Sequence, residues 1–303
     1  MTERLSKDIK ETAEFINAEL EKICDGYEQN EIFVPEMKAV VDSARYSLTA
    51  GGKRIRPYLV RCFSRLCGGS DKDAVTLGCA LEMVHTYSLI HDDLPCMDND
   101  DFRRGKPTNH KVFGEATAVL AGDALLTEAF SVICSGSLPD KAKLSAVKIL
   151  SSRAGILGMI GGQEIDLSSE GKEIPLDTLY SLQRKKTGML IEAACLLGCV
   201  CADDVTEDKT ECASEFAHAF GLAFQITDDI LDVIGDEKEL GKDIGSDAEE
   251  NKCTFVTYLG LDGARAEAEK QIGNAKDCIR KQFCGETVDI LCELCDYLLT
   301  RKS

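Results

Sequence analysis

The chain has 303 residues, of which 44% are hydrophobic and 29% are charged. This length and apolar content suit one large folded domain or two small ones, and they exclude a disordered chain. The formal net charge of −18 repels nucleic acids and anionic membrane surfaces, so neither is expected as the main partner.

The sequence predicts no targeting segment and no membrane-spanning segment. The N-terminus, Met1 to Asp8, is charged and has no apolar run before a small-residue cleavage site, which predicts a cytoplasmic protein. The longest apolar stretch, 189–202, contains Glu192 and is too short to cross a bilayer, so we expect a buried helix there and no stable membrane insertion.

The fifteen cysteines are scattered and odd in number, which indicates reduced thiols rather than a disulfide framework. Cys292 and Cys295 form one Cys-x-x-Cys pair without a second pair at zinc spacing, which argues against a structural zinc site. Most of the thiols are expected to pack as small hydrophobic side chains on helices.

Helical periodicity dominates the chain from its start. Apolar side chains recur every three or four positions between Leu5 and Ile23, which predicts a first amphipathic helix. Pro35 and Pro57 are expected to open the second and third helices, which glycine pairs at 51–52 and 68–69 end, and Asp71 is expected to cap the fourth. Further helices are predicted at about 116–135, 140–163, 176–202, 207–234 and 254–300. Since alternating strand patterns and flexible linkers are missing, the sequence predicts a single all-α domain over 1–303.

A first acidic cluster follows the apolar run of the fourth predicted helix. Its five aspartates are Asp92, Asp93, Asp98, Asp100 and Asp101. Carboxylates gathered at the end of a buried helix repel one another unless a cation neutralises them. Oxygen ligands without a Cys or His scaffold favour Mg²⁺ or Mn²⁺, and the glycine and glutamate of an EF-hand loop are missing. A solvated acidic turn is the alternative interpretation of this cluster alone.

A second acidic cluster, Asp228, Asp229 and Asp232, lies 136 residues after the first and also follows an apolar helical run. Asp228 and Asp232 are four residues apart, so they share one face of a helix. Two such helices facing each other across a cavity would hold metal ions between them. The second cluster therefore favours the metal site over the acidic turn.

Basic side chains stand beside both clusters, in the segments Lys53–Arg56, Arg103–Lys106 and Lys185–Lys186 and at Lys242 and Lys252. Taken singly they suit surface ion pairs, which contribute only about 0–1 kcal/mol each. Together with two acidic clusters they suit a diphosphate, because a metal bridges its oxygens while Arg and Lys donate charge-assisted hydrogen bonds.

These segments resemble the trans-polyprenyl diphosphate synthases, and they are most similar to the bacterial farnesyl and plant-type geranylgeranyl enzymes. The motifs that carry the resemblance stand in the family's order: Gly-Gly-Lys-Arg-Ile-Arg-Pro (51–57), His-Thr-Tyr-Ser-Leu-Ile-His-Asp-Asp-Leu-Pro-Cys-Met-Asp (85–98), Arg-Arg-Gly-Lys-Pro-Thr (103–108), Ala-Gly-Asp-Ala-Leu-Leu (121–126), Gly-Gly-Gln (161–163), Lys-Thr-Gly (186–188), Phe-Gln-Ile-Thr-Asp-Asp-Ile-Leu-Asp (224–232) and Gly-Lys-Asp (241–243).

The resemblance implies an all-α barrel of about ten helices around a deep apolar cavity, assembled as a homodimer. It implies about three Mg²⁺ per active site, with Mn²⁺ as a substitute, held by Asp92, Asp98 and Asp228 and supported by Asp93 and Asp232. It assigns the allylic diphosphate to Arg103, Lys186, Thr187, Gln225, Lys242 and Lys252, and isopentenyl diphosphate to Lys53, Arg56, His85 and Arg104.

In this chemistry the allylic C–O bond ionises, the cation adds to isopentenyl diphosphate, and a proton is then lost. No side-chain nucleophile is required, and His91 is interpreted as a packed histidine rather than a general base. The groups expected to drive the reaction are the metal-binding Asp92, Asp98 and Asp228 together with Lys186 and Arg103.

Product length is expected to depend on Tyr87, with its neighbour Ser88, as a floor beneath the growing chain. Tyr87 lies five residues before Asp92, about 7.5 Å back along the helix. In the family an aromatic residue at this position accompanies a C15 product, which predicts farnesyl diphosphate; a Tyr87 that only packs in the core is the alternative.

Three other functions stay open on the sequence alone. A geranylgeranyl diphosphate synthase would use the same residues with a longer product. A terpene cyclase normally replaces the second cluster with an Asn/Asp–Ser/Thr–Glu motif, which this chain lacks, and a regulatory subunit would have lost its aspartate motifs. A plain magnesium-binding helical protein would leave the paired acidic and basic segments without a role.

Overall fold

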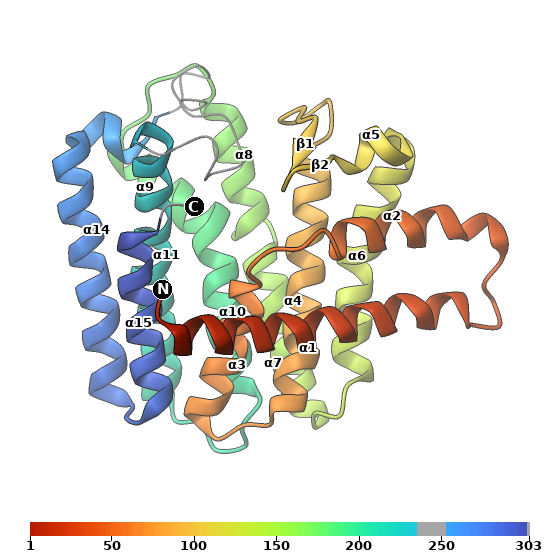
Figure 1. Cartoon of the computed structure of the whole chain (residues 1–303), viewed down its shortest axis with the longest axis horizontal. Coiled ribbons are helices and arrows are strands. Elements are labelled where there is room, and N and C mark those ends of the chain that lie inside the picture. The colour runs from red at the N-terminus through yellow and green to blue at the C-terminus, as the bar shows by residue number, and fades with distance from the viewer. Residues whose placement is uncertain (235–252, 302–303) are drawn as a thin grey trace.

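Helices make up most of the chain that the structure describes, which confirms the predicted all-α fold class (Figure 1). The computed structural model describes residues 1–234 and 253–301. The helices are α1 (Glu3–Glu28), α2 (Lys38–Leu48) after a 3₁₀ turn at Pro35–Met37, α3 (Ile55–Cys67), α4 (Asp71–Asp92), α5 (Asn109–Phe113), α6 (Glu115–Ser135), α7 (Asp140–Ala154), α8 (Met159–Ser169), α9 (Leu176–Gln183), α10 (Met189–Val200), α11 (Glu207–Ile234), α14 (Phe255–Gln282) and α15 (Glu286–Thr300). A π-helical turn, η2 (Arg184–Gly188), joins α9 to α10.

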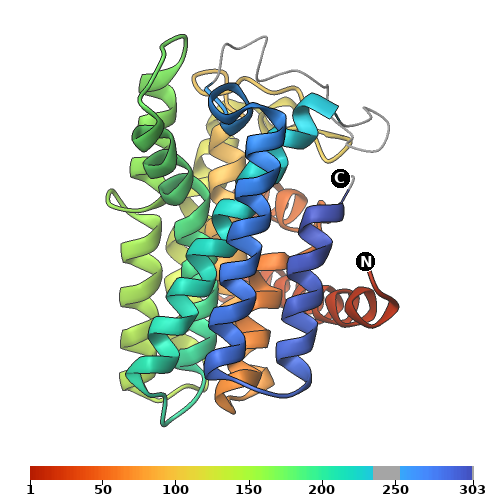
Figure 2. The ribbon, with the colours of Figure 1, turned by 90° about the vertical axis from the view of Figure 1, so that its left-hand side faces the viewer.

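The long helices stand side by side as an upright bundle, and α1 and α2 lie across it (Figures 1 and 2). Within the bundle α11 packs along α14, α4 along α6, and α10 along α3. The predicted buried helix is confirmed, because every residue of α10 from Leu190 to Cys199 is buried. At Gly198 this helix comes so close to α3 that a Cβ would lie 2.5 Å from the carbonyl oxygen of Val60.

Several predicted helices differ from the observed ones, either in where they begin or end or because the observed helix is interrupted. The helix predicted at 140–163 is two helices, since the chain leaves helical geometry at Gly155 and Gly158. The helix predicted at 254–300 is interrupted twice, by a kink within α14 at Gly260, which has a φ of 68°, and at 283–285, where Gly285 has a φ of 99°. The cap of α4 is Ser70 rather than Asp71: the Ser70 hydroxyl accepts a hydrogen bond from the Asp73 N–H at 3.4 Å.

The sequence also missed a small antiparallel hairpin, β1 (Phe102–Arg103) and β2 (Lys106–Pro107). Its turn residues Arg104 and Gly105 have φ angles of 53° and 72°. Positive φ at both central residues suits a tight hairpin turn. The hairpin follows the first acidic cluster directly and fixes the directions of two arginines there.

All fifteen cysteines are free thiols, in agreement with the predicted reduced state.

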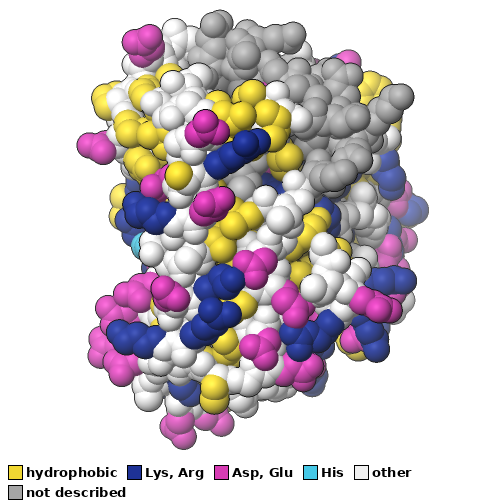
Figure 3. Space-filling view, turned by 60° about the vertical axis from the view of Figure 1, so that its left-hand side comes forward, with side chains coloured by type: hydrophobic (Ala, Val, Ile, Leu, Met, Phe, Trp, Pro, Cys, Tyr) yellow, Lys and Arg dark blue, Asp and Glu magenta, His cyan; other side chains and the backbone are white. Residues whose placement is uncertain are grey.

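On the side of the molecule at the left of Figure 1, acidic and basic side chains are interspersed over the surface (Figure 3).

Candidate active site

The first acidic cluster lies where α4 ends. After Asp92 the chain turns back, and the Asp98 N–H donates a hydrogen bond to the Asp92 carbonyl at 2.8 Å. Burial raises the pKa of the Asp92 carboxyl to about 6, with Asp98 and Asp93 adding to the rise and Lys186 and Arg103 opposing it. The fold therefore gathers negative charge here at an energetic cost, which a bound cation would relieve.

Within this cluster Asp93 already has a cationic partner. The Arg103 Nε donates to Asp93 Oδ1 at 2.7 Å, and Asp93 is only 3% exposed. Burial raises the pKa of Asp93 while this bond to Arg103 lowers it. The hairpin thus holds Arg103 against the first cluster, and its neighbour Arg104 donates to the Gly51 carbonyl.

The second acidic cluster lies near the C-terminal end of α11, and its aspartates have different surroundings. Asp228 Oδ1 accepts a hydrogen bond from Arg301 at 2.5 Å. The Asp229 carboxylate instead accepts from the Phe255 N–H at 2.7 Å, at the first residue of α14. Asp232 is 3% exposed. Asp229 therefore ties the start of α14 to α11, and both Asp228 and Asp229 line a cavity.

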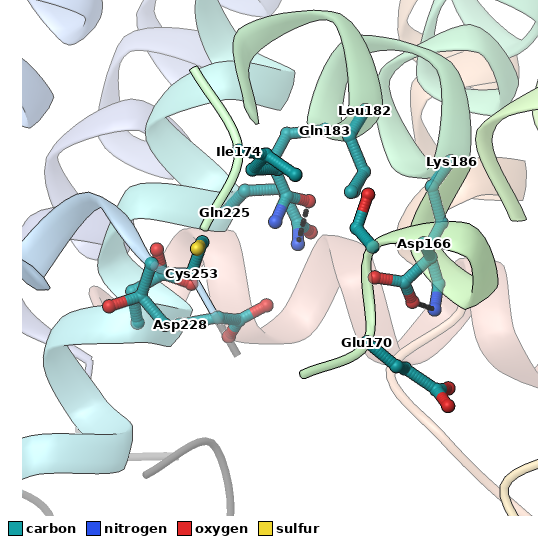
Figure 4. A pocket seen from close by; sticks show the side chains of 12 residues that line it. Asp166, Glu170, Ile174, Leu182, Gln183, Lys186, Gln225, Asp228 and Cys253 are labelled. Atoms are coloured by element: carbon teal, nitrogen blue, oxygen red, sulfur yellow. Dashed lines mark hydrogen bonds and ion pairs between the residues drawn. The ribbon is translucent and has the colours of Figure 1, made fainter. Parts of the chain in front are cut away.

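That cavity, of about 270 Å³, is lined by Asp166, Gln183, Lys186, Gln225 and Asp228 among others (Figure 4). Lys186 pairs with Asp166, and Gln225 Nε2 donates to Gln183 Oε1 at 3.0 Å. Lys186, which lines this cavity, also lowers the pKa of Asp92 at the end of α4. Asp166 and Gln183 were not anticipated from the sequence.

The position of Lys186 depends on the π-helical turn η2 and on a glycine of α8. A Cβ at Gly162 would lie 2.2 Å from the Lys186 backbone nitrogen. Only a glycine permits this approach without moving the turn. Thr187, the next residue of η2, is half-buried.

A second cavity, of about 240 Å³, brings together the four residues assigned to isopentenyl diphosphate: Lys53, Arg56, His85 and Arg104. Arg56 Nη1 lies 3.3 Å from His85 Nε2, and burial together with Arg56 and Arg104 holds the pKa of His85 well below its usual value. Arg54, in contrast, is 3% exposed and is paired with Glu82 at 2.6 Å, which gives it a structural partner. The lining carries an excess of positive charge, which suits an anion.

Arg301 connects the two cavities, and sequence reasoning missed it. It lines the second cavity and also donates to Asp228 of the first. The same Nη2 donates to the Phe224 carbonyl at 3.0 Å and to Thr227 Oγ1 at 2.9 Å. A single arginine near position 300 has no local motif, so only the fold reveals this contact.

Both residues of the predicted floor lie on α4. Tyr87 is 6% exposed, and its hydroxyl is buried without a hydrogen-bond partner in the described residues. Ser88 Oγ donates to the His85 carbonyl at 2.9 Å. Lys242 and Lys252, which the sequence placed near the allylic diphosphate, fall outside the described residues.

The donor set suits magnesium by its chemistry. Its ligand atoms are carboxylate oxygens, and burial raises the pKa of Asp92 although Lys186 and Arg103 oppose the rise. Among residues 1–234 and 253–301, no three acidic, His or Cys side chains stand close enough to hold a metal ion together.

The sequence model described as Polyprenyl synthetase matches residues 37–293. The chain belongs to the polyprenyl synthetase family. This match includes every lining residue of the first cavity and most of those of the second, whose Leu294, Tyr297, Leu298 and Arg301 lie beyond it.

Individual relatives agree with this family assignment. The farnesyl diphosphate synthase of Bacillus subtilis is 47% identical over 86% of this chain and 88% of its own length. A geranylgeranyl diphosphate synthase of Cyanophora paradoxa is 45% identical over 87% of this chain and 88% of its own. Among solved structures, an FPP/GFPP synthase of Zymomonas mobilis superposes with a TM-score of 0.85 at 35% identity, covering 98% of this chain and 100% of that one.

Proposed function

We propose that this chain is a short-chain trans-prenyltransferase that condenses isopentenyl diphosphate with dimethylallyl or geranyl diphosphate and releases farnesyl diphosphate. One observation carries the proposal: a cavity rich in Lys and Arg lies next to a cavity that holds Lys186 and the second acidic cluster's Asp228, and Arg301 links the two. Two adjacent sites for two diphosphates are what this condensation needs. The similarity to bacterial farnesyl diphosphate synthases supports the substrate class.

The allylic substrate is assigned to the acidic cavity. Prenyltransferases of this family generally depend on Mg²⁺, and Asp92, Asp98 and Asp228 would hold it here, with Asp93 and Asp232 in support. Bound Mg²⁺ supplies Lewis-acid stabilisation of the departing diphosphate. Lys186, Thr187 and Gln225 hold the same diphosphate by hydrogen bonds, and Lys242 and Lys252 are proposed to join them. Arg103 acts from the hairpin, where it balances Asp93.

Isopentenyl diphosphate is assigned to the basic cavity, with its diphosphate on Lys53, Arg56 and Arg104. A neutral His85 donates or accepts a hydrogen bond there without adding charge, since the pKa of this imidazole is held low by burial and by the arginines. These side chains place the double bond beside the allylic carbon. Loss of the diphosphate then leaves an allylic cation that this double bond attacks, and the released diphosphate takes up the proton whose loss completes the product.

Tyr87 is proposed to stop the growing chain at C15. Its ring is buried on the same helix as Asp92, one to two turns below the metal-binding end. Ser88 would line the same floor. A geranylgeranyl product is the competing endpoint, and relatives of both kinds match the chain.

The deciding assay uses purified protein, isopentenyl diphosphate, one allylic primer at a time and Mg²⁺. After dephosphorylation, products are sized by chromatography. We expect C15 from the C5 and C10 primers, little elongation of a C15 primer, and no product after chelation of the metal. A dominant C20 product would replace farnesyl with geranylgeranyl, and the absence of any elongation would contradict the proposed reaction.

We also propose that residues 1–303 form one domain and that the enzyme is a cytoplasmic homodimer. Fifteen free thiols suit a reducing compartment. Helix α6 and the segment 140–169 are long and apolar enough to cross a membrane by length and composition alone. Only 33% and 28% of their most apolar windows are buried within one copy of the chain, so much of their apolar surface is exposed there. Their exposed apolar side chains, which a second copy of the chain would cover, are Val119, Leu120, Leu144, Ile156, Leu157 and Ile160.

A further inference from the structure

The imidazole of His91 joins α4 to α6 directly below the first acidic cluster. Its Nε2 lies 3.1 Å from the Val119 carbonyl oxygen, so this nitrogen carries the proton and donates. His91 precedes Asp92 in sequence, yet its side chain is engaged with α6 rather than with the carboxylates. The proposed reaction does not use it.

The same imidazole also contacts Tyr87, one helical turn earlier. The two ring centroids lie 5.7 Å apart with an interplanar angle of 81°, an edge-to-face pair. Tyr87 is buried, and its hydroxyl has no hydrogen-bond partner in the described residues. Packing alone therefore holds the Tyr87 ring, and His91 is the aromatic neighbour that the structure gives it.

A glycine of α6 makes room for this arrangement. A Cβ at Gly122 would lie 2.1 Å from His91 Nε2 and 2.5 Å from its Cδ2. Neither distance is tolerable, so any larger residue at this position has to push the imidazole away from α6. Gly122 thus leaves the space that the His91 ring occupies.

We propose that His91 is a positioning residue for product length: seated on Gly122 and bonded to Val119, it fixes the Tyr87 ring at the floor of the chain-elongation path. The inference rests on the proposed function, in which Tyr87 limits the product. It adds that contacts with α6, and not Tyr87 alone, determine where the floor lies.

Substitutions on α6 and α4 test this directly. Gly122→Ala displaces His91 without removing any group from the site, and we expect the C20:C15 product ratio to rise by about threefold to tenfold, the factor that one lost net hydrogen bond gives. The rate of C15 formation from geranyl diphosphate should stay within about twofold of wild type. Gly273→Ala, on α14 with nothing within 4 Å of the added Cβ, is the matched control and should leave the ratio unchanged.

Variants at His91 separate the hydrogen bond from the ring contact. His91→Gln keeps a donor for Val119, His91→Phe keeps an edge-to-face ring against Tyr87, and His91→Ala removes both. We expect the Gln and Phe variants to fall between wild type and His91→Ala in the C20:C15 ratio. A thermal melt of each variant identifies any that fail to fold, and the remaining ones carry the comparison.

Tyr87→Ala distinguishes failure of this inference from failure of the proposed floor. If Tyr87→Ala lengthens the product while Gly122→Ala and the folded His91 variants still give the wild-type ratio, the positioning role is overturned and the floor stands. If Tyr87→Ala itself leaves a C15 product, the floor is wrong and the inference falls with it. Longer products from the variants at Tyr87, Gly122 and His91 would support both the floor and the positioning role of His91.

Discussion

At the scale of single residues, Asp228 stands out because its partner comes from the far end of the chain. Arg301 donates to Asp228 Oδ1 at 2.5 Å, and its Cζ lies 4.3 Å from the centre of the Phe224 ring. The Arg301 side chain is 8% exposed. A buried arginine over an aromatic face is a strong local cation, so the protein neutralises part of its own second cluster.

Replacing Asp228 with alanine should lower kcat by at least about a thousandfold, because the metal loses a proposed ligand from one wall and the leaving diphosphate loses stabilisation. Steady-state kinetics with geranyl diphosphate and saturating Mg²⁺ measure the effect. Asp208→Asn, an exposed aspartate in the first turn of the same helix, is the control and should retain wild-type turnover. Near-normal rates for Asp228→Ala would rule out its assignment to the metal.

Much of the site could be predicted from residue types and spacing, because both acidic clusters end apolar helical runs. Other parts could not. The contact between Arg301 and Asp228 joins positions 73 residues apart and leaves no local pattern. The hairpin strands have two residues each, too few for an alternating signal. The partners Asp166 and Gln183 depend on how η2 turns, which tertiary packing decides.

At the scale of elements, the π-helical turn η2 and helix α8 form one unit. The turn lies within the helix predicted at 176–202 and directs Lys186 to Asp166 on α8. Short π-helical turns inside helices are frequent at functional sites. Because Gly162 touches the Lys186 backbone, the distance between α8 and η2 decides where the Lys186 ammonium stands.

Gly162→Ala should therefore weaken catalysis without removing a charged group. We expect kcat/KM for the allylic substrate to fall by at least about a hundredfold, because a displacement of about 1 Å at a positioned group costs that much. The KM for isopentenyl diphosphate should change less, since the basic cavity does not include η2. If the initial-rate data showed an equal loss of kcat/KM for both substrates, the role of the contact between α8 and η2 would be contradicted and general misfolding would be indicated.

At the scale of the whole molecule, apolar side chains lie exposed on three consecutive elements, α6, α7 and the segment leading into α8. Ile156 and Leu157 are 82% and 79% exposed, and Leu144 is 71% exposed. Large exposed apolar surfaces mark association sites in soluble proteins. This surface is the basis for the proposed homodimer.

Ile156→Glu combined with Leu144→Glu should dissociate the dimer, because a twofold-symmetric interface meets each new charge twice. Sedimentation equilibrium without detergent should show a dissociation constant weakened by at least about a hundredfold. Ala18→Glu, on the exposed side of α1, adds the same charge elsewhere and should leave the association unchanged. A wild-type protein that sediments as a monomer would end the dimer proposal.

The hydrogen bond from the Phe255 N–H to Asp229 gives two neighbouring aspartates separate duties. A carboxylate at the amino end of a helix stabilises it through the unpaired N–H groups and the helix dipole. Damage at Asp229 would accordingly show first as a lower melting temperature of the whole protein, whereas damage at Asp228 would show first as a loss of turnover. Screening this stretch by activity alone would confuse a folding defect with a chemical one, so calorimetry has to accompany the kinetics.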